Sequence, residues 1–405
     1  MEAHTLENID MRRLGQELKL AREKRNLKQQ EAARIIDVAR TTMVAIEKGV
    51  RRVKAEELIA LARAYGRQVS DFMRPRPEIQ PFRVQYRGPY KPKAEDKERI
   101  QQYEDLFESL CRDYVELEDI VEAPLPREYP PEYDVKGLPV EQAAEEIATK
   151  ERNRLGLGSC PIGDLRAILE EKVGIRIFYI EMQPSTFSEM YYYDDSLGAC
   201  MAINRLHSPG RRLWSEGHGF LHFLAHRYQA VVHVENVYQR VPESEQLADF
   251  FALYFLMPTT EVRERYHKII RSKGYPTPAD LCILADYFGV AVAAMTRRLE
   301  DMRMLPTGTW QKLKDRGFRV REAQQKLGLR AEGRPPDVMP LRYQYLALEG
   351  LEAGKISEGQ FARFLRLDRL EARVVAESLR EHAGGITDES IVDLDIRQSL
   401  KENAA

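Results

Sequence analysis

The chain's most concentrated chemistry lies in a group of histidines near its middle. Five of its eight histidines fall between His207 and His233. His218 and His222 are four residues apart, so on a helix their imidazoles share one face and can bind the same metal ion. Glu243 or Glu245, at the start of the next apolar segment, can supply a third ligand. Two imidazoles, one carboxylate and an open position are typical of catalytic zinc, so the sequence predicts one Zn²⁺ per chain.

The residue after His218 argues against hydrolysis at this site. In zinc peptidases with the pattern HExxH that residue is a glutamate, the general base, whereas this chain has Gly219. Glu216 is nearby, but two residues on a helix are about 200° apart, so its side chain points away. Loss of a general base costs about a hundred- to ten-thousand-fold in rate. We therefore predict metal ligands but no catalytic residue, and peptidase activity stays open with the balance against it.

Each of these residues also has a plainer interpretation. Glu243 shares the first turn of the expected helix with Glu245, and either carboxylate can simply stabilise that helix end. His226 lies one helical turn beyond the pair, and the drift of the helix turns it away from a shared ion, which favours a packing role. We interpret His207 and His233 as surface or loop histidines.

A second chemical signature is the positive charge of the N-terminal segment. Residues 11–76 contain 17 lysines and arginines against 8 acidic residues, although the whole chain has a net charge of −2. Binding to phosphates releases counterions, so a compact basic segment favours a polyanionic partner such as double-stranded DNA. A solvated charged surface is the alternative.

Two short helices in this segment flank a tight turn at residues 36–39, which is typical of a helix-turn-helix that places its second helix in the major groove. We expect that helix over residues 40–48, with Met43 and Ile46 facing inward. Its outward residues are predicted to contact base edges: Arg40, Thr41, Thr42, Val44 and Ala45. Others are predicted to contact the sugar-phosphate backbone: Gln29, Gln30, Arg51 and Arg52. A helical bundle that never touches DNA is the competing interpretation.

Residue types along residues 11–73 resemble the Cro/C1-type (XRE) helix-turn-helix family. The matching residues are Gln29, Ala33, Val38, Thr42, Ile46, Glu47, Gly49 and Leu58, with the tail Leu61-Ala62-Arg63-Ala64-Tyr65-Gly66. Lys28 departs from the family, which usually has a Ser or Thr helix cap there, and this weakens the cap without changing the expected fold. Such modules usually act as pairs on half-sites about 34 Å apart, so we expect a homodimer.

Residues 140–303 resemble the ImmA/IrrE-type metallopeptidase domain. The matching residues are Asn204, Arg211, Arg212, His218, His222, His226, Glu245, Ala248, Phe251, Ala252 and Leu256-Met257-Pro258, with the closing segment LADYFGVAVAAMTRRLE. The resemblance implies that His218, His222 and Glu245 are metal ligands. The family's catalytic glutamate has no counterpart because Gly219 occupies its place.

Apolar periodicity predicts a mainly α protein with a small β-sheet, an α+β fold. We expect a five-helix DNA-binding domain over residues 11–73, a linker with a long helix over 74–135, a zincin-like α+β domain over 136–303 and a helical region over 304–405. Strands are expected near residues 175–180, 190–193 and 200–203. Long apolar helices are expected near 211–226, 243–257 and 277–288.

The composition is that of a globular protein in a reducing compartment. No run of about 18 apolar residues is present to cross a membrane, and the first residues carry no secretory signal. Four scattered cysteines without CxxC spacing suggest no disulfide framework. We therefore expect a cytoplasmic protein.

Three functions are consistent with these observations. The first is a sequence-specific transcriptional regulator whose degenerate peptidase-like domain senses a ligand, metal or partner. The second is an active zinc endopeptidase that cleaves a repressor and uses a substitute base such as Glu189. The third is an antitoxin or antirepressor that acts through protein contacts.

Overall fold

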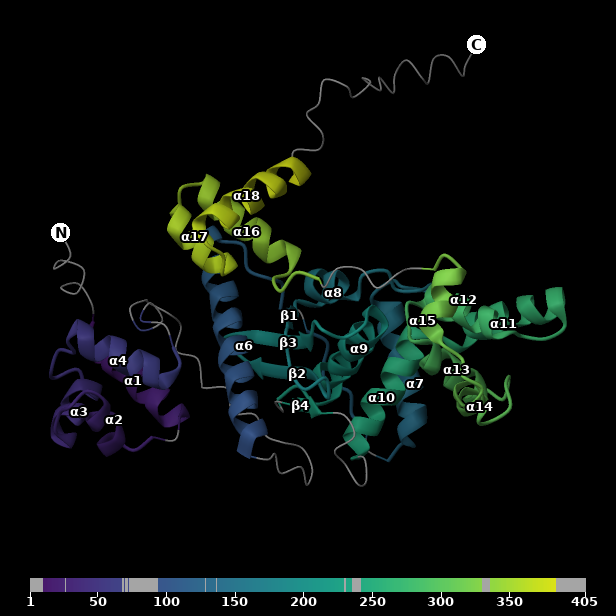
Figure 1. Ribbon diagram of the computed structural model, residues 1–405, viewed down its shortest axis with the longest axis horizontal. Coiled ribbons are helices and arrows are strands. Elements are labelled where there is room, and N and C mark those ends of the chain that lie inside the picture. Colours follow the sequence, from purple (N-terminus) through teal and green to yellow (C-terminus); the bar gives the residue numbers. More distant parts are fainter. Residues whose placement is uncertain are drawn as a thin grey trace, which may run out of the picture.

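The computed structural model describes residues 10–25, 27–67, 69, 72, 94–127, 129–135, 137–228, 231–234, 242–329 and 336–383. These residues form many helices around one small sheet, which confirms the expected mainly α fold with a small β-sheet (Figure 1). No single helix among them is long and apolar enough to cross a membrane, and the helices Pro278–Phe288 and Val292–Asp301 reach that standard only as a pair bent by 103°.

The N-terminal domain consists of α1 (Met11–Lys24), α2 (Gln29–Ile35), α3 (Arg40–Glu47) and α4 (Ala55–Tyr65). The expected fifth helix lies almost wholly outside the described residues. Apolar faces from all four helices meet in one core: Leu14, Leu18, Ala33, Met43, Ile46, Leu58 and Leu61 are buried there. Gly49 has a φ of +68°, and a Cβ there would lie 2.4 Å from the Arg12 Cα. Only glycine fits this turn.

A buried ion pair joins α1 to α3 within this domain. Arg22 donates to both carboxylate oxygens of Glu47, at 2.5 and 3.1 Å, and Gln29 donates to the same carboxylate at 2.9 Å. Lys28 does not cap α2 with its side chain, but its backbone N–H donates to Glu31 at 2.6 Å. Glu31 thus offsets part of the missing cap.

The central sheet contains β1 (Arg176–Ile180), β2 (Phe187–Asp194), β3 (Gly198–Asn204) and β4 (Val231–Val234). Their order is β1-β3-β2-β4, with β1 parallel to β3 and the other pairs antiparallel. The first three strands confirm the sequence-based expectation. The fourth was not expected, because a four-residue strand is too short to show alternation.

One face of the sheet is covered by α7 (Val140–Arg154), α9 (Pro209–Ala225) and α10 (Glu243–Leu256). Phe220, Phe251 and Phe255 fill the space between α9 and α10. Further helices extend this layer: α8 (Leu165–Ile168) with its π-helical continuation Leu169–Val173, α11 (Thr259–Lys273), α12 (Pro278–Phe288), α13 (Val292–Asp301), α14 (Thr309–Asp315) and α15 (Val320–Lys326).

The other face is covered by α6 (Ala94–Val121), and the C-terminal helices α16 (Leu341–Glu352), α17 (Glu358–Leu365) and α18 (Arg369–Ala383) gather at the upper end of α6 (Figure 1). One core contains residues from all of these elements and from the sheet: Phe107, Leu110, Tyr114, Phe178, Met190, Tyr192, Tyr343, Leu346, Phe361 and Phe364. Segments far apart in sequence therefore pack as one structural layer.

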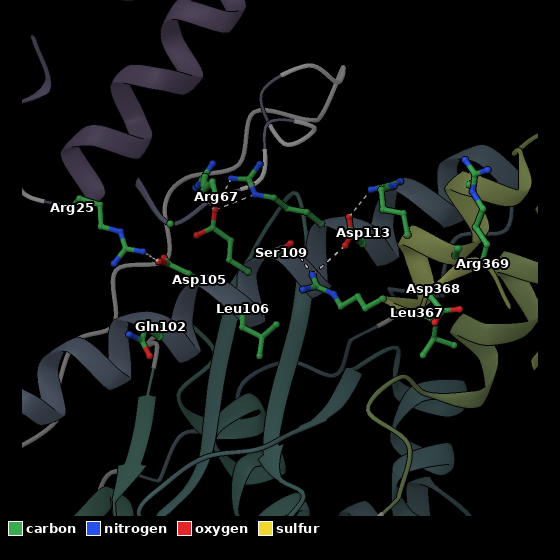
Figure 2. Close-up of a pocket in the computed structure, with 17 residues that line it drawn as sticks. Arg25, Arg67, Gln102, Asp105, Leu106, Ser109, Asp113, Leu367, Asp368 and Arg369 are labelled. Atoms are coloured by element: carbon green, nitrogen blue, oxygen red, sulfur yellow. Dashed lines mark hydrogen bonds and ion pairs between the residues drawn. The ribbon is translucent and has the colours of Figure 1, made fainter. Parts of the chain in front are cut away.

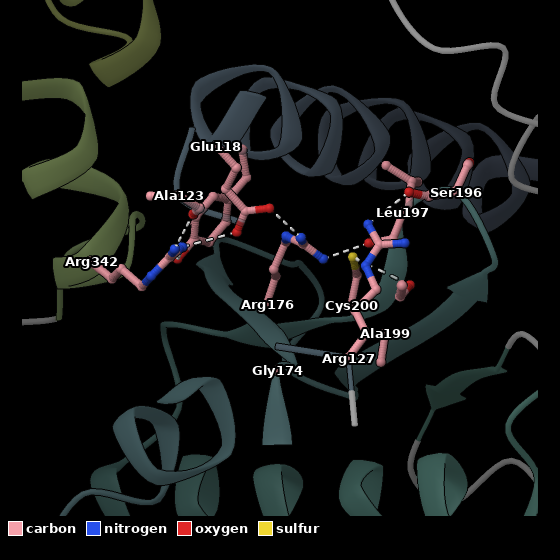
Figure 3. A network of polar contacts seen from close by, with 12 residues as sticks. Glu118, Ala123, Arg127, Gly174, Arg176, Ser196, Leu197, Ala199, Cys200 and Arg342 are labelled. Atoms are coloured by element: carbon pink, nitrogen blue, oxygen red, sulfur yellow. Dashed lines mark hydrogen bonds and ion pairs between the residues drawn. The ribbon is translucent and has the colours of Figure 1, made fainter. Parts of the chain in front are cut away.

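A network of charges is buried where α6, β1 and α16 meet (Figure 3). Arg176 is wholly buried, forms an ion pair with Glu118 and donates to the Leu197 carbonyl. Arg342 contacts the other oxygen of Glu118 at 2.9 Å. Burying these charges is tolerable only because each has partners.

Candidate nucleic-acid interface and candidate metal centre

Helix α3 presents a polar face on the side of the N-terminal domain that points away from α6 (Figure 1). Arg40 and Thr41 are exposed, whereas Met43 and Ile46 are buried in the domain core as expected. Thr42, Val44 and Ala45 are half-buried on the outer side. The five side chains predicted to read bases are therefore all accessible.

The residues predicted to contact phosphates divide into two kinds. Gln30 and Arg52 are exposed. Gln29 already donates to Glu47 at 2.9 Å, and Arg51 makes two hydrogen bonds of 2.8 Å with Glu57. The pairing of Arg51 fixes the start of α4, so its guanidinium is engaged within the domain.

A shallow hollow of about 310 Å³ beside α3 contains basic residues that the sequence reasoning passed over. Gln29 and Val44 line it together with Arg12, Lys19 and Lys48. These three cations come from α1 and from the end of α3. The sequence shows these three charges only as part of the net charge of the segment. Their gathering beside α3 depends on how the helices pack, which is a property of the tertiary structure.

The candidate metal centre is formed by α9 and α10. Helix α9 carries His218 and His222 on one face, with ring centroids 4.9 Å apart. Glu245 approaches from the first turn of α10: one carboxylate oxygen lies 3.6 Å from His218 Nε2 and the other lies 3.6 Å from His222 Nε2. All three side chains are almost fully buried. The exposed Glu243 lies outside this group.

These separations fit a zinc ion. Tetrahedral zinc holds nitrogen and oxygen ligands at about 2.0–2.2 Å, which places the ligand atoms about 3.3–3.5 Å from one another. The 3.6 Å separations require only a small inward movement of the side chains. The sequence-predicted ligands are thus brought together by the fold.

Glu189, from β2, lies against the opposite side of the His218 ring. Its Oε1 is 2.6 Å from His218 Nδ1, and both side chains are buried. Glu189, His218 and His222 also form a triad whose ligand atoms lie within 4.8 Å of one another. Because Nδ1 faces Glu189 and Nε2 faces Glu245, we assign Glu245 to the ligand side and Glu189 to the orientation of His218.

Electrostatics around His218 are dominated by acidic groups. Burial by itself lowers the pKa of His218, but the neighbouring Glu189 carboxylate outweighs it and raises that pKa to about 10. An imidazole must be neutral to bind a metal, so binding would release this proton.

Gly219 is packed where the missing glutamate would begin. A Cβ at this position would lie 3.0 Å from Met201 Sδ and 3.5 Å from Glu189 Oε1. The space beside His218 is therefore occupied by side chains from β2 and β3. Glu216 points elsewhere, as expected: its carboxylate accepts a hydrogen bond from Tyr179, and burial raises the pKa of Glu216 to about 7.

Asp249 is a residue of the site that the sequence reasoning missed. Its Oδ1 lies 3.7 Å from His218 Nε2, and its side chain is 51% exposed. It follows Glu245 by four residues, so the helical spacing that paired the histidines could have found it. Asp249 gives the buried site a carboxylate at its solvent-facing edge.

The other histidines take different roles. His226 Nδ1 lies 3.3 Å from His222 Nδ1, which is the ring nitrogen of His222 that does not face Glu245. We expected His207 on the surface or in a loop; it lies in the loop between β3 and α9 but is only 4% exposed, with Nε2 2.9 Å from the Ser185 carbonyl. The turn after β3 buries His207 beneath the loop that precedes β2. His233 lies on β4.

Two family models match the parts of the chain that carry these candidate sites. Residues 18–72 match the helix-turn-helix family, and residues 170–300 match the IrrE N-terminal-like domain family of peptidases. The chain thus combines an XRE-type helix-turn-helix with an IrrE/ImmA-like domain, as the sequence resemblances predicted. The sequence matches no curated protein.

Similar solved structures include Bacillus thuringiensis PlcR in complex with the peptide PapR7 and DNA, at 11% identity over 97% of this chain and 98% of that chain, with a TM-score of 0.15. ComR from Streptococcus suis is similar at 11% identity over 98% of this chain and 95% of that chain, also with a TM-score of 0.15. Scores this low support no argument about the present chain.

Proposed function

We propose that this protein is a sequence-specific transcriptional regulator whose IrrE-like domain holds a metal and senses a signal without hydrolysing peptides. The observation that supports it best is the accessible outer face of α3, carried by a helix-turn-helix that points away from the rest of the chain. Arg40 can pair with guanine, and Thr41 or Thr42 can contact a thymine methyl group or a phosphate.

One recognition helix reads only a few base pairs. Regulators of this type reach useful specificity by placing two such helices in successive major grooves, about 34 Å apart. We therefore propose a homodimer on a pseudopalindromic operator.

The proposed metal ligands are His218, His222 and Glu245, with Glu189 holding His218 in the required orientation. A bound Zn²⁺ would act as a Lewis acid or as a structural link between helices. The residues themselves join α9 to α10, so binding there can change how tightly these two helices pack.

Absence of a glutamate at residue 219 supports a sensor over a hydrolase. A general base must reach the open side of the site, and Gly219 has no side chain to do so. Glu189, the nearest carboxylate to that position, is engaged by His218 Nδ1 at 2.6 Å. A base held on the far side of the imidazole is poorly placed to take a proton from a substrate.

The test of this function is selection of bound fragments from genomic DNA at low salt, followed by affinity measurements on the recovered sequence. We expect a shared motif and at least about a tenfold loss of affinity for Arg40→Ala, since a good bidentate base contact contributes about 1–3 kcal/mol. Arg373→Ala, on α18, is the matched control and should bind as the wild type does. Failure to recover any DNA would rule the proposal out.

A zinc endopeptidase that cleaves a repressor is the second candidate, favoured by the solvent-facing Asp249 carboxylate 3.7 Å from His218 Nε2. It predicts cleavage of a co-expressed repressor that stops in both His218→Ala and Asp249→Asn. An antitoxin or antirepressor role would instead show a stoichiometric protein partner in a pull-down and no operator. Zinc-loaded wild-type protein that leaves every repressor intact would dispose of the peptidase.

A further inference from the structure

A wide polar cleft separates the N-terminal domain from the rest of the chain (Figure 2). Its volume is about 950 Å³, and its walls come from the ends of α1 and α4, from the middle of α6 and from α17 with the turn that follows it. This volume lies at the upper end of the usual range for small-molecule sites, about 300–1,000 Å³. The cleft is the place where a bound molecule would touch both the DNA-binding domain and the C-terminal helices.

Arginines dominate the lining. Six of them line the cleft together with four carboxylates, and two further carboxylates, Glu17 and Glu116, pair with Arg67 and Arg363. The arginines are Arg25, Arg67, Arg112, Arg363, Arg366 and Arg369, and the acids are Asp105, Glu108, Asp113 and Asp368. Planar guanidinium groups match the geometry of phosphate oxygens and can bind them in pairs.

The side of the cleft formed by the DNA-binding domain is held by two ion pairs. Arg25 contacts Asp105 at 2.8 Å and also donates to the Tyr65 carbonyl at 2.8 Å, which ties it firmly in place. Arg67 contacts Glu108 at 3.3 Å and Glu17 at 3.8 Å, and both separations are longer than that of the Arg25 pair. Of the two arginines on this wall, Arg67 therefore gives up the weaker ion pairs when it binds a ligand.

The opposite wall is formed by α17. Arg363 reaches Asp113 and Glu116, both at 3.3 Å, and Arg366 reaches Asp113 at 3.2 Å and Ser109 at 2.8 Å. Optimal charge-assisted hydrogen bonds measure about 2.7–2.9 Å, so the ion pairs of these two arginines are long. Both arginines contact the Asp113 carboxylate, so an incoming anion can take hydrogen bonds from either guanidinium group without breaking a short ion pair.

Arg366 also has an unusual backbone. It ends α17 in the left-handed conformation, with a φ of +56°, where glycine is the usual residue. A long cationic side chain therefore stands at a position whose backbone disfavours it, and that side chain donates to Ser109 and Asp113 in the cleft.

We propose that this cleft binds a small phosphorylated molecule between Arg67 on one wall and Arg363 with Arg366 on the other. Its phosphate oxygens take hydrogen bonds from guanidinium groups whose present ion pairs are long. Because the ligand bridges both walls, it holds the DNA-binding domain against α6 and α17. This second step rests on the proposed function: a domain held in place is less free to reach its half-site, so operator affinity falls.

Binding is tested without DNA, on the full-length protein, by calorimetry with inorganic triphosphate and with ATP as probes. We expect saturable binding of at least one probe, weakened at least tenfold in the double variant Arg363→Gln/Arg366→Gln. Arg319→Gln is the control, since Arg319 pairs with Glu322 on α15 outside the cleft. Arg366→Lys keeps the charge and should lose less affinity, which provides a second variant if the double one unfolds.

Three results would overturn the site: no binding of either probe, equal binding by the wild type and the double variant, or equally tight binding of sulfate at matched ionic strength. The last would show attraction to charge without a specific site. Circular dichroism melting of each variant confirms that a loss of binding is not a loss of fold.

Regulation is tested by fluorescence anisotropy with the selected operator, with and without the bound probe. We expect at least a threefold loss of wild-type operator affinity on adding the probe and no change in the double variant. Unchanged wild-type affinity overturns the regulatory step. A double variant that loses operator affinity without any probe would assign the cleft to the DNA surface instead. A protein that binds the probe but no DNA would retain the site and refute the proposed regulator.

Discussion

His218 lies between two carboxylates that act on different ring nitrogens. Glu189 contacts Nδ1 at 2.6 Å, and Glu245 lies 3.6 Å from Nε2. Two sets of candidate ligands share His218 and His222: one adds Glu189 and the other adds Glu245. We separate them because a carboxylate on Nδ1 orients the ring, whereas one beside Nε2 can share the metal. At the residue scale, the proposed zinc ligands His218, His222 and Glu245 lie together, and Gly219 stands where a peptidase of this pattern has its glutamate.

The ligand assignment predicts different losses for three glutamates. We expect about one zinc per chain in the wild type and none in Glu245→Gln, whereas Glu189→Gln should weaken zinc affinity about 10–100-fold, as loss of a group behind a ligand usually does. Glu243→Gln, exposed and two residues from Glu245, is the control and should keep its zinc. Mass spectrometry of the purified proteins and competition with a chelator measure both quantities. Loss of zinc in Glu243→Gln but not in Glu245→Gln would reverse the assignment.

Restoring the HExxH pattern should harm the metal-free protein. In Gly219→Glu the new Cβ meets Met201 Sδ at 3.0 Å, and the new carboxylate enters a buried region that already contains Glu189. Repulsion and desolvation of like charges are both unfavourable there. We expect a lower Tm in the presence of a chelator and no peptidase activity with zinc.

Gly219→Ala separates volume from charge in that experiment, because it adds the Cβ alone and gains about 1 kcal/mol of helix propensity. Its Tm should lie above that of Gly219→Glu. A Gly219→Glu protein as stable as the wild type and active on peptides would contradict the view that the site is built around glycine.

The elements of the DNA-binding domain position charges for two distinct purposes. Arg51 joins the turn after α3 to the start of α4 through two hydrogen bonds with Glu57, both 2.8 Å long. Arg52, the next residue, is exposed. Arg51 therefore holds the start of α4, whereas Arg52 is the one of the two that we propose contacts a phosphate.

This difference predicts separable effects. Arg52→Gln should weaken binding to all DNA sequences alike and reduce the slope of log affinity against log salt by about one, as loss of one phosphate contact does. Arg51→Gln should chiefly lower the Tm. Affinity titrations at several salt concentrations, together with thermal melts, distinguish the two. If Arg51→Gln changed the salt slope with no change in Tm, the pairing with Glu57 would be unimportant.

The same ion pair makes the domain sensitive to acid. The hydrogen bond from Arg51 holds the pKa of Glu57 below its usual value. A carboxyl group whose pKa is depressed by folding adds stability above its unfolded pKa, and that stability is lost as the pH falls through the folded pKa. We expect stability to decline on acidification below the ordinary glutamate range, and Glu57→Gln to flatten that decline. Urea unfolding of the wild type and of Glu57→Gln at a series of pH values measures this decline in stability. Parallel curves for the two proteins would contradict the prediction.

At the scale of the whole molecule, the sheet is enclosed by helices from both ends of the chain. Helix α6 and helices α16 to α18 form one layer, and their charges meet at Glu118, which contacts both Arg176 and Arg342. This junction connects a strand of the IrrE-like domain to the helix that lines the cleft and adjoins the DNA-binding domain. It therefore joins α6 and the sheet to the C-terminal helix α16.

Removing the shared carboxylate should be costly. Glu118→Gln leaves Arg176 buried with a weaker partner, and breaking a buried ion pair from one side costs about 3–5 kcal/mol. Glu122→Gln is the control on the same chain segment, because Glu122 is 83% exposed and contacts only Lys355 at 3.3 Å among the ion pairs described here; exposed pairs contribute about 0–1 kcal/mol. Urea unfolding compares the two. Equal losses would show that the buried network contributes little.

The sequence by itself determined the features that follow from local periodicity. Spacing of three and four residues identified α6, α9, α10 and α12, and the same rule placed His218 and His222 on one face because an α-helix brings residues four apart together. Local residue types also identified the helix-turn-helix and the positive φ at Gly49. These properties depend on neighbours along the chain, so they can be read from it.

Only the tertiary structure decided which distant groups meet. Glu189 is 29 residues from His218 and comes from a strand, so nothing in the helix pattern shows that it contacts Nδ1. The pairing of Arg51, the burial of His207 and the joining of Arg342 to Glu118 across 224 residues were equally invisible. The physical reason is that such contacts depend on how the faces of separate elements align, which is set by packing of the whole core and not by the spacing within any one element.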